Sequence, residues 1–109
     1  MSTSDQYSKT ISFVDNVNIR NIASMYAAIT DSFQSNDSIV IDIAENADAD
    51  LSFVQLIESA RRHAKDHAKS IALSAPATGQ VLKVLERAGF LEAFNPDDTK
   101  FWLHEEVTQ

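Results

Sequence analysis

Two histidines, His63 and His67, lie four residues apart in the sequence. On a helix this spacing brings both imidazoles to one side, where they could share a metal ion. The residues between them are Ala64, Lys65 and Asp66, so a catalytic glutamate is missing. No third ligand is evident, and the neighbouring cations would repel a divalent ion. We therefore predict no metal site and interpret the two histidines as cations near a helix C-terminus, where the helix dipole favours positive charge.

Other patterns typical of catalysis are also missing. The chain has two glycines, Gly79 and Gly89, in unrelated places, which argues against a phosphate-binding loop. No serine lies in a Gly-x-Ser-x-Gly turn. A phosphoacceptor receiver domain needs a cluster of acids at strand ends, whereas Asp15 stands alone and Asp42 lies inside a predicted strand. The sequence contains no cysteine. We predict a protein that is not an enzyme and that has no catalytic residues and no cofactor.

The segment 46–56 is the strongest candidate for a functional site. Here an acidic loop without periodicity meets the start of a predicted helix. Free backbone N–H groups and the positive end of the helix dipole favour an anionic group at such a place. Asp50 can cap this helix, or Ser52 can do so with Gln55 completing a capping box. The sequence does not choose between these two caps.

Two large apolar residues, Leu51 and Phe53, lie in the first turn of this helix. At least one of them is expected to face solvent, and an exposed apolar side chain beside polar ones is typical of a protein contact site. The predicted partner-binding residues are Asn46, Asp48, Asp50, Leu51, Ser52, Phe53 and Gln55.

The length and charge of the chain limit the setting of this site. With 109 residues, the chain can form one domain with its own core. The net charge of −7 argues against nucleic acid as a partner. No apolar run approaches the roughly 20 residues that span a bilayer, and the N-terminus lacks a secretion signal. We predict a cytoplasmic protein without membrane insertion, with a flexible leader at 1–9 and a single domain at 10–109.

The hydrophobic pattern predicts alternating strands and helices. Polar residues alternate with Ile11 and Phe13, which indicates a half-buried strand over 10–14. The apolar run 38–43 indicates a central strand covered on both faces. A helix ending near Ser35 has its predicted core stripe at Ile22, Met25, Tyr26, Ile29 and Phe33. The other expected elements are a short strand at 17–19, helices at 51–67 and 77–88, a strand at 70–74, a turn at 95–98 and an edge strand at 101–103. We predict an α/β fold with a mixed sheet of four to five strands and helices packed mainly on one face.

The order of these elements and several of their residues resemble the STAS domain family, which includes the bacterial anti-sigma factor antagonists. The resemblance covers about residues 10–94. Its most specific part is Asp50-Leu-Ser-Phe-Val-Gln-Leu-Ile57, which is similar to the family's strand-to-helix signature, usually Asp-Ser-Ser-Gly-Leu. The segments 10–14, 17–19, 38–43 and 74–90 resemble the family's opening strands, central strand and ending.

This resemblance implies a regulatory module that binds another protein. In the switching members of the family, a partner kinase phosphorylates the first serine or threonine of the signature, and the phosphate releases the partner. Leu51 holds that position here, and Phe53 holds the glycine position. We therefore expect a constitutive docking surface for an anti-sigma serine kinase or another signalling kinase, with Ser52 as an alternative phosphorylation site. The other roles considered are an accessory subunit of a chemotaxis signalling or transporter complex, and a small-molecule or nucleotide sensor.

Overall fold

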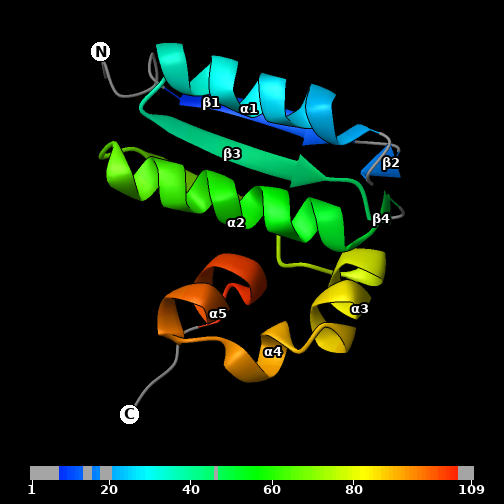
Figure 1. Cartoon of the computed structure of the whole chain (residues 1–109). Helices are drawn as coiled ribbons and strands as arrows, with labels where there is room; N and C mark the ends of the chain where they lie inside the picture. Colours follow the sequence, from blue (N-terminus) through cyan, green and yellow to red (C-terminus); the bar gives the residue numbers. More distant parts are fainter. Residues whose placement is uncertain (1–7, 14–15, 18–20, 46, 106–109) are drawn as a thin grey trace.

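A parallel sheet forms one layer of the fold (Figure 1). The computed structural model describes residues 8–13, 16–17, 21–45 and 47–105. Within these ranges the main sheet has three strands, β1 (Ser8–Phe13), β3 (Ser38–Ile43) and β5 (Ser70–Leu73), in the order β1-β3-β5. Two short strands, β2 (Asn16–Val17) and β4 (Asp48–Ala49), form a second pair. The predicted α/β class is confirmed.

The predicted mixed sheet of four to five strands is wrong. The main sheet is smaller, and every strand pair in the described part of the chain is parallel. Parallel neighbours need long connections, and helices provide both crossovers of the main sheet. The predicted strand at 17–19 is represented by Val17 in β2, whereas 18–20 lie outside the described residues. Of the predicted leader, residues 8 and 9 belong to β1, and residues 1–7 are not described.

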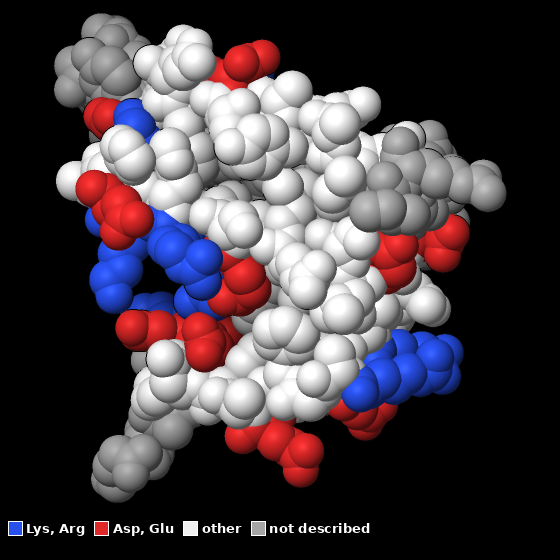
Figure 2. Space-filling view, in the orientation of Figure 1, with Lys and Arg blue, Asp and Glu red and all other residues white. Residues whose placement is uncertain are grey.

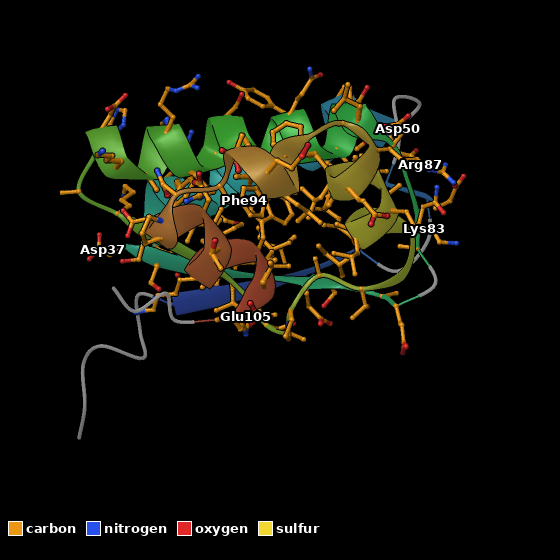
Figure 3. All side chains as sticks on the ribbon, turned by 90° about the horizontal axis from the view of Figure 1, so that it is seen from below. Asp37, Asp50, Lys83, Arg87, Phe94 and Glu105 are labelled. Atoms are coloured by element: carbon orange, nitrogen blue, oxygen red, sulfur yellow. The ribbon has the colours of Figure 1, made fainter. Side chains whose placement is uncertain are left out.

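Two helices cover one face of the main sheet. α1 (Ile22–Ser35) and α2 (Leu51–Asp66) lie on the same side of the strands, as the two views in Figures 1 and 3 show. One residue from each strand, Ile11, Ile41 and Leu73, shares a row of the sheet, and all three side chains are buried. Much of the core therefore lies between the sheet and these two helices, in agreement with the predicted one-sided packing, and it extends to Val81, Leu85 and Trp102 of the later helices.

The buried side of α1 follows the predicted stripe in part, since Ile22 is half-buried and Tyr26 faces solvent. On α1, Met25, Ile29 and Phe33 are buried, but the side chain of Tyr26 is 57% exposed. Its predicted place in the core is wrong, because Tyr26 lies at the margin of the stripe and lines the open groove between α1 and α2. The buried residues of α2 are Phe53, Val54, Leu56, Ile57, Ala60 and Ala64.

The opposite face of the sheet is open and mostly polar. Its outward positions are Thr10, Ser12, Val40, Asp42, Ala72 and Ser74. Val40 and Asp42 are only half-buried, so the prediction of a strand covered on both faces is wrong. Asp42 accepts hydrogen bonds from the hydroxyls of Ser74 (2.7 Å) and Ser12 (3.4 Å). Small and polar neighbours on β1 and β5 explain why no described helix packs over this side (Figures 1 and 3).

Three helices follow β5, of which α3 and α5 contact α2 and α4 connects them (Figure 1). α3 (Gly79–Arg87) corresponds to the predicted helix at 77–88, and it ends before Gly89, which has the left-handed conformation expected of a C-terminal glycine (φ 81°). α4 (Phe90–Ala93) and α5 (Pro96–Leu103) complete the chain. None of the helices in the described ranges is both long and apolar enough to span a membrane.

The predicted edge strand at 101–103 is wrong, because these residues form the last turn of α5. The segment 95–98, which was expected to be a turn, contains the N-cap and first turn of this helix. The side chain of Asn95 accepts a hydrogen bond from the Asp98 N–H (2.8 Å), and the carboxylate of Asp98 accepts one from the Asn95 N–H (3.2 Å). Pro96 occupies the first position of the helix, where its missing N–H has no cost.

A cluster of contacts joins α5 to α2. The indole of Trp102, which is fully buried, donates a hydrogen bond to the carboxylate of Glu58 (2.7 Å). The guanidinium of Arg61 pairs with Glu58 (2.8 Å) and with Asp98 (2.9 Å). It also lies 4.5 Å from the ring centre of Phe101. These contacts fix α5 against the C-terminal half of α2 and beside β5.

Candidate functional site

The start of α2 has a defined cap. Asp50 is extended (φ −134°, ψ −175°), and its carboxylate oxygen Oδ1 accepts a hydrogen bond from the Ser52 N–H at 3.0 Å. Of the two caps that the sequence allows, the structure therefore has Asp50. Ser52 lies inside the first turn and is half-buried, and Gln55 is exposed.

Removing this cap should weaken the start of α2. We expect Asp50→Ala to lower the free energy of unfolding by about 1 kcal/mol, because one helix N–H loses its partner and a favourable charge leaves the positive end of the helix dipole. Urea unfolding followed by circular dichroism measures this change. Asp50→Asn keeps an acceptor at the same place and should recover most of the loss. Equal losses in the two variants would contradict the capping role.

The two apolar residues of the first turn have different environments. Leu51 is 42% exposed, which confirms the expectation that at least one of the pair faces solvent. Phe53 is fully buried and packs edge-on against Phe13, with ring centres 6.0 Å apart and an angle of 84° between the planes. The prediction that Phe53 contacts a partner is therefore wrong, because its side chain forms part of the core.

The other predicted contact residues are distributed around this helix start. Asp48 is exposed on β4, next to the buried Ala47 and Ala49 that anchor the loop. Asn46 lies outside the described residues. The structure thus brings the exposed or half-exposed members of the predicted set to one end of α2.

This end of the molecule also carries positive charge. Figure 3 shows Lys83 and Arg87 of α3 at the same end as Asp50, and Asp37 at the opposite end. α3 approaches the loop before β4 very closely at Gly79, which has φ of 56°. A Cβ atom at Gly79 would lie 2.6 Å from the backbone oxygen of Glu45. The absence of a side chain at Gly79 therefore allows α3 to support the loop that leads to α2.

A shallow groove between α1 and α2 adjoins the helix start. It has a volume of about 410 Å³ and is lined by Ile22, Ala23, Tyr26, Ser52, Gln55, Leu56 and Ser59. Tyr26 and Leu51 are the large apolar side chains that the described residues expose. The exposure of Tyr26 does not follow from the sequence, because its spacing matches the core stripe. Apolar, hydroxyl and amide groups on an open surface are suited to contact with another protein.

The two histidines of α2, His63 and His67, contact each other and a neighbouring aromatic ring in the described part of the chain. His63 and His67 stack with ring centres 4.1 Å apart, and His63 also contacts the ring of Phe33 at 5.2 Å. Nδ1 of His67 lies 2.9 Å from the backbone oxygen of His63. Among the described residues no group of three or more histidine, cysteine or acidic side chains could hold a metal ion.

The exposed helix start and the groove beside it form a surface suited to protein contact, which we call the α2 surface and define by Tyr26, Asp48, Leu51, Ser52 and Gln55. Comparisons of the chain with family models, with curated proteins and with solved structures find no match.

Proposed function

We propose that the protein is a non-enzymatic regulatory module of the STAS type that docks another protein through the α2 surface. The observation that carries this proposal is the exposed Leu51 at a capped helix start. A hydrogen-bonded Asp50 holds the turn in place, so the apolar side chain is presented in one geometry. Polar groups of Ser52 and Gln55 surround it and can form the rim of a contact.

The docking surface is constitutive in this proposal. Leu51 has no hydroxyl, so a kinase cannot place a phosphate at the position that the resemblance assigns to the phosphoacceptor. The neighbouring Ser52 is half-buried, and its N–H is already bonded to Asp50. Regulation then comes from the amount or the state of the partner. The partner class that the resemblance favours is an anti-sigma serine kinase or another signalling kinase in the cytoplasm.

The central test is Leu51→Asp. A carboxylate at the middle of an apolar contact has to be desolvated on binding, so we expect the free energy of binding to weaken by about 2 kcal/mol, or roughly 30-fold in Kd. Isothermal titration calorimetry with the anti-sigma kinase of the same organism measures this change. Ala93→Asp adds the same charge to the exposed surface of α4 and serves as the matched control, with little expected effect.

Two results would contradict the proposal. Equal binding by Leu51→Asp and by the unmodified protein would place the docking surface elsewhere. Incubation with the kinase and ATP, followed by mass spectrometry, tests the constitutive state. Stoichiometric phosphate on Ser52 together with a fall in binding would replace the constitutive surface by a switch at the neighbouring position.

A further inference from the structure

A second surface lies far from the helix start, between the C-terminal half of α2, β5 and α5. It is a groove of about 930 Å³, which we call the β5 groove. Its lining includes all four residues of β5, from Ser70 to Leu73, together with side chains of the two helices. Figure 2 shows a hollow in this region, with Lys and Arg side chains around it and Asp and Glu side chains next to them.

The floor of the β5 groove is the edge of a sheet. Within the described residues β5 pairs with β3 and with no strand on its other side. The Ser70 N–H bonds to the backbone oxygen of Asp37 (2.8 Å), and the Ser74 N–H bonds to that of Ile41 (2.9 Å). In a parallel ladder alternate residues direct their backbone groups to the same neighbour. The backbone N–H and C=O groups of Ser70 and Ser74 therefore point toward β3.

The intervening residues must point the other way. By this alternation Ile71 and Leu73 direct their N–H and C=O groups away from β3, toward the β5 groove. No described residue outside the main sheet forms a backbone hydrogen bond with either of them. These groups form a short template on which an extended chain can add as a strand.

The lining of the β5 groove has more cations than carboxylates, although the whole chain has a net charge of −7. The charged lining residues are Arg61, Arg62, Lys65, Lys69 and Lys100 against Glu58, Asp97 and Asp98. Arg61 pairs with two carboxylates of the lining, and Lys69 pairs with Asp37 outside it. Arg62 and Lys65 are exposed and form no ion pair with another described residue. The groove is thus suited to an occupant with negative charge.

We propose that the β5 groove binds an extended acidic peptide of a partner protein, which adds to β5 as a fourth strand of the main sheet. The open backbone groups of Ile71 and Leu73 require an extended chain, and the cations on α2 require acidic side chains. A second copy of this protein is a poor occupant, because the same cations would face one another when two β5 edges meet. The proposal does not depend on the α2 surface, since the two surfaces involve different ends of α2.

Fluorescence anisotropy can test this proposal with the full-length chain. The probe is a labelled peptide of about eight residues, a typical strand length, in which glutamate alternates with valine. We expect saturable binding that weakens with added salt. The double variant Arg62→Glu with Lys65→Glu should raise Kd at least about tenfold. Lys83→Glu is the matched charge control, because Lys83 lies on α3 at the end of the molecule opposite Asp37, and Asp37 pairs with Lys69 of the groove. It should change Kd by less than about twofold.

Strand addition itself needs a separate test. The same peptide with every backbone nitrogen methylated keeps its charges but cannot donate backbone hydrogen bonds, so its binding should be lost. On the protein side, Ile71→Pro removes one outward N–H and leaves the ladder to β3 intact, and it should weaken binding at least about fivefold. The methylated peptide keeps the test valid if this variant is unstable.

Three outcomes would overturn the proposal. The first is the absence of peptide binding up to millimolar concentration. The second is equal binding of the methylated peptide, which would show a purely ionic contact with no added strand. The third is a dimer in analytical ultracentrifugation that Ile71→Pro dissociates, because the β5 edge would then be occupied by a second copy.

Discussion

Replacing Trp102 by alanine should lower the free energy of unfolding by about 4 kcal/mol. The indole is fully buried and donates its N–H to Glu58 at 2.7 Å, so the change leaves a large cavity and removes a hydrogen bond to a charged group. Urea unfolding followed by far-ultraviolet circular dichroism is the suitable measurement, because Trp102 is the sole tryptophan and its fluorescence is lost in the variant.

The variant Trp102→Phe separates the contribution of the filled space from that of the hydrogen bond to Glu58. Phenylalanine fills most of the space but has no N–H donor, so we expect a smaller loss of about 2 kcal/mol. A loss below about 1 kcal/mol for Trp102→Ala would be incompatible with α5 as an integral part of the core. A weakly held α5 would also be a poor wall for the β5 groove.

The second large effect is expected at Gly79, where alanine should destabilise the fold by about 3 kcal/mol. The backbone of Gly79 is left-handed (φ 56°), which costs a residue with a side chain about 1 kcal/mol. The added Cβ would also lie 2.6 Å from the backbone oxygen of Glu45, so α3 or the loop before β4 has to move. Thermal and urea unfolding of Gly79→Ala measure the loss.

The variant Gly89→Ala measures the cost of a left-handed backbone alone and serves as the control. Gly89 is also left-handed (φ 81°), but a Cβ there would have no atom within 4 Å. We expect a loss of only about 1 kcal/mol. The difference between the two variants measures the close approach to Glu45. Equal losses would show that this approach does not constrain the loop leading to the α2 surface.

Much of the fold follows from local patterns in the sequence. Alternation of apolar and polar residues correctly predicted β1, and spacings of three and four residues correctly predicted α1, α2 and α3. Such patterns reflect burial on one side of a single element. They do not determine which elements become neighbours, and so the size of the sheet and the direction of its strands were predicted wrongly.

The error at α5 has a different physical origin. The run Phe101-Trp-Leu103 is aromatic and apolar, which is typical of a strand. However, Asn95, Pro96 and Asp98 form a complete helix start, and this local signal outweighs the strand propensity of three residues. A capping box immediately after a loop would have identified the helix from the sequence.

The sequence predicts the start of α2 correctly, but not the environment of every side chain near it. The helix start and its exposed apolar residue could be inferred, because Asp50 is a good cap and the next residue lies outside the helix stripe. Phe53 and Tyr26 were assigned to the wrong environments. Phe53 is covered by Phe13 from β1, and Tyr26 lies at the open groove between α1 and α2, so both outcomes depend on packing between segments far apart in the sequence.

The uncovered side of the main sheet bears on how the protein behaves at high concentration. Asp42, near the middle of that side, is held by two serine hydroxyls and stays in contact with water. If two molecules stacked these sides together, both carboxylates would lose their hydration without gaining a cation. Asp42 should therefore disfavour stacking of two molecules through this face, which the described helices leave uncovered.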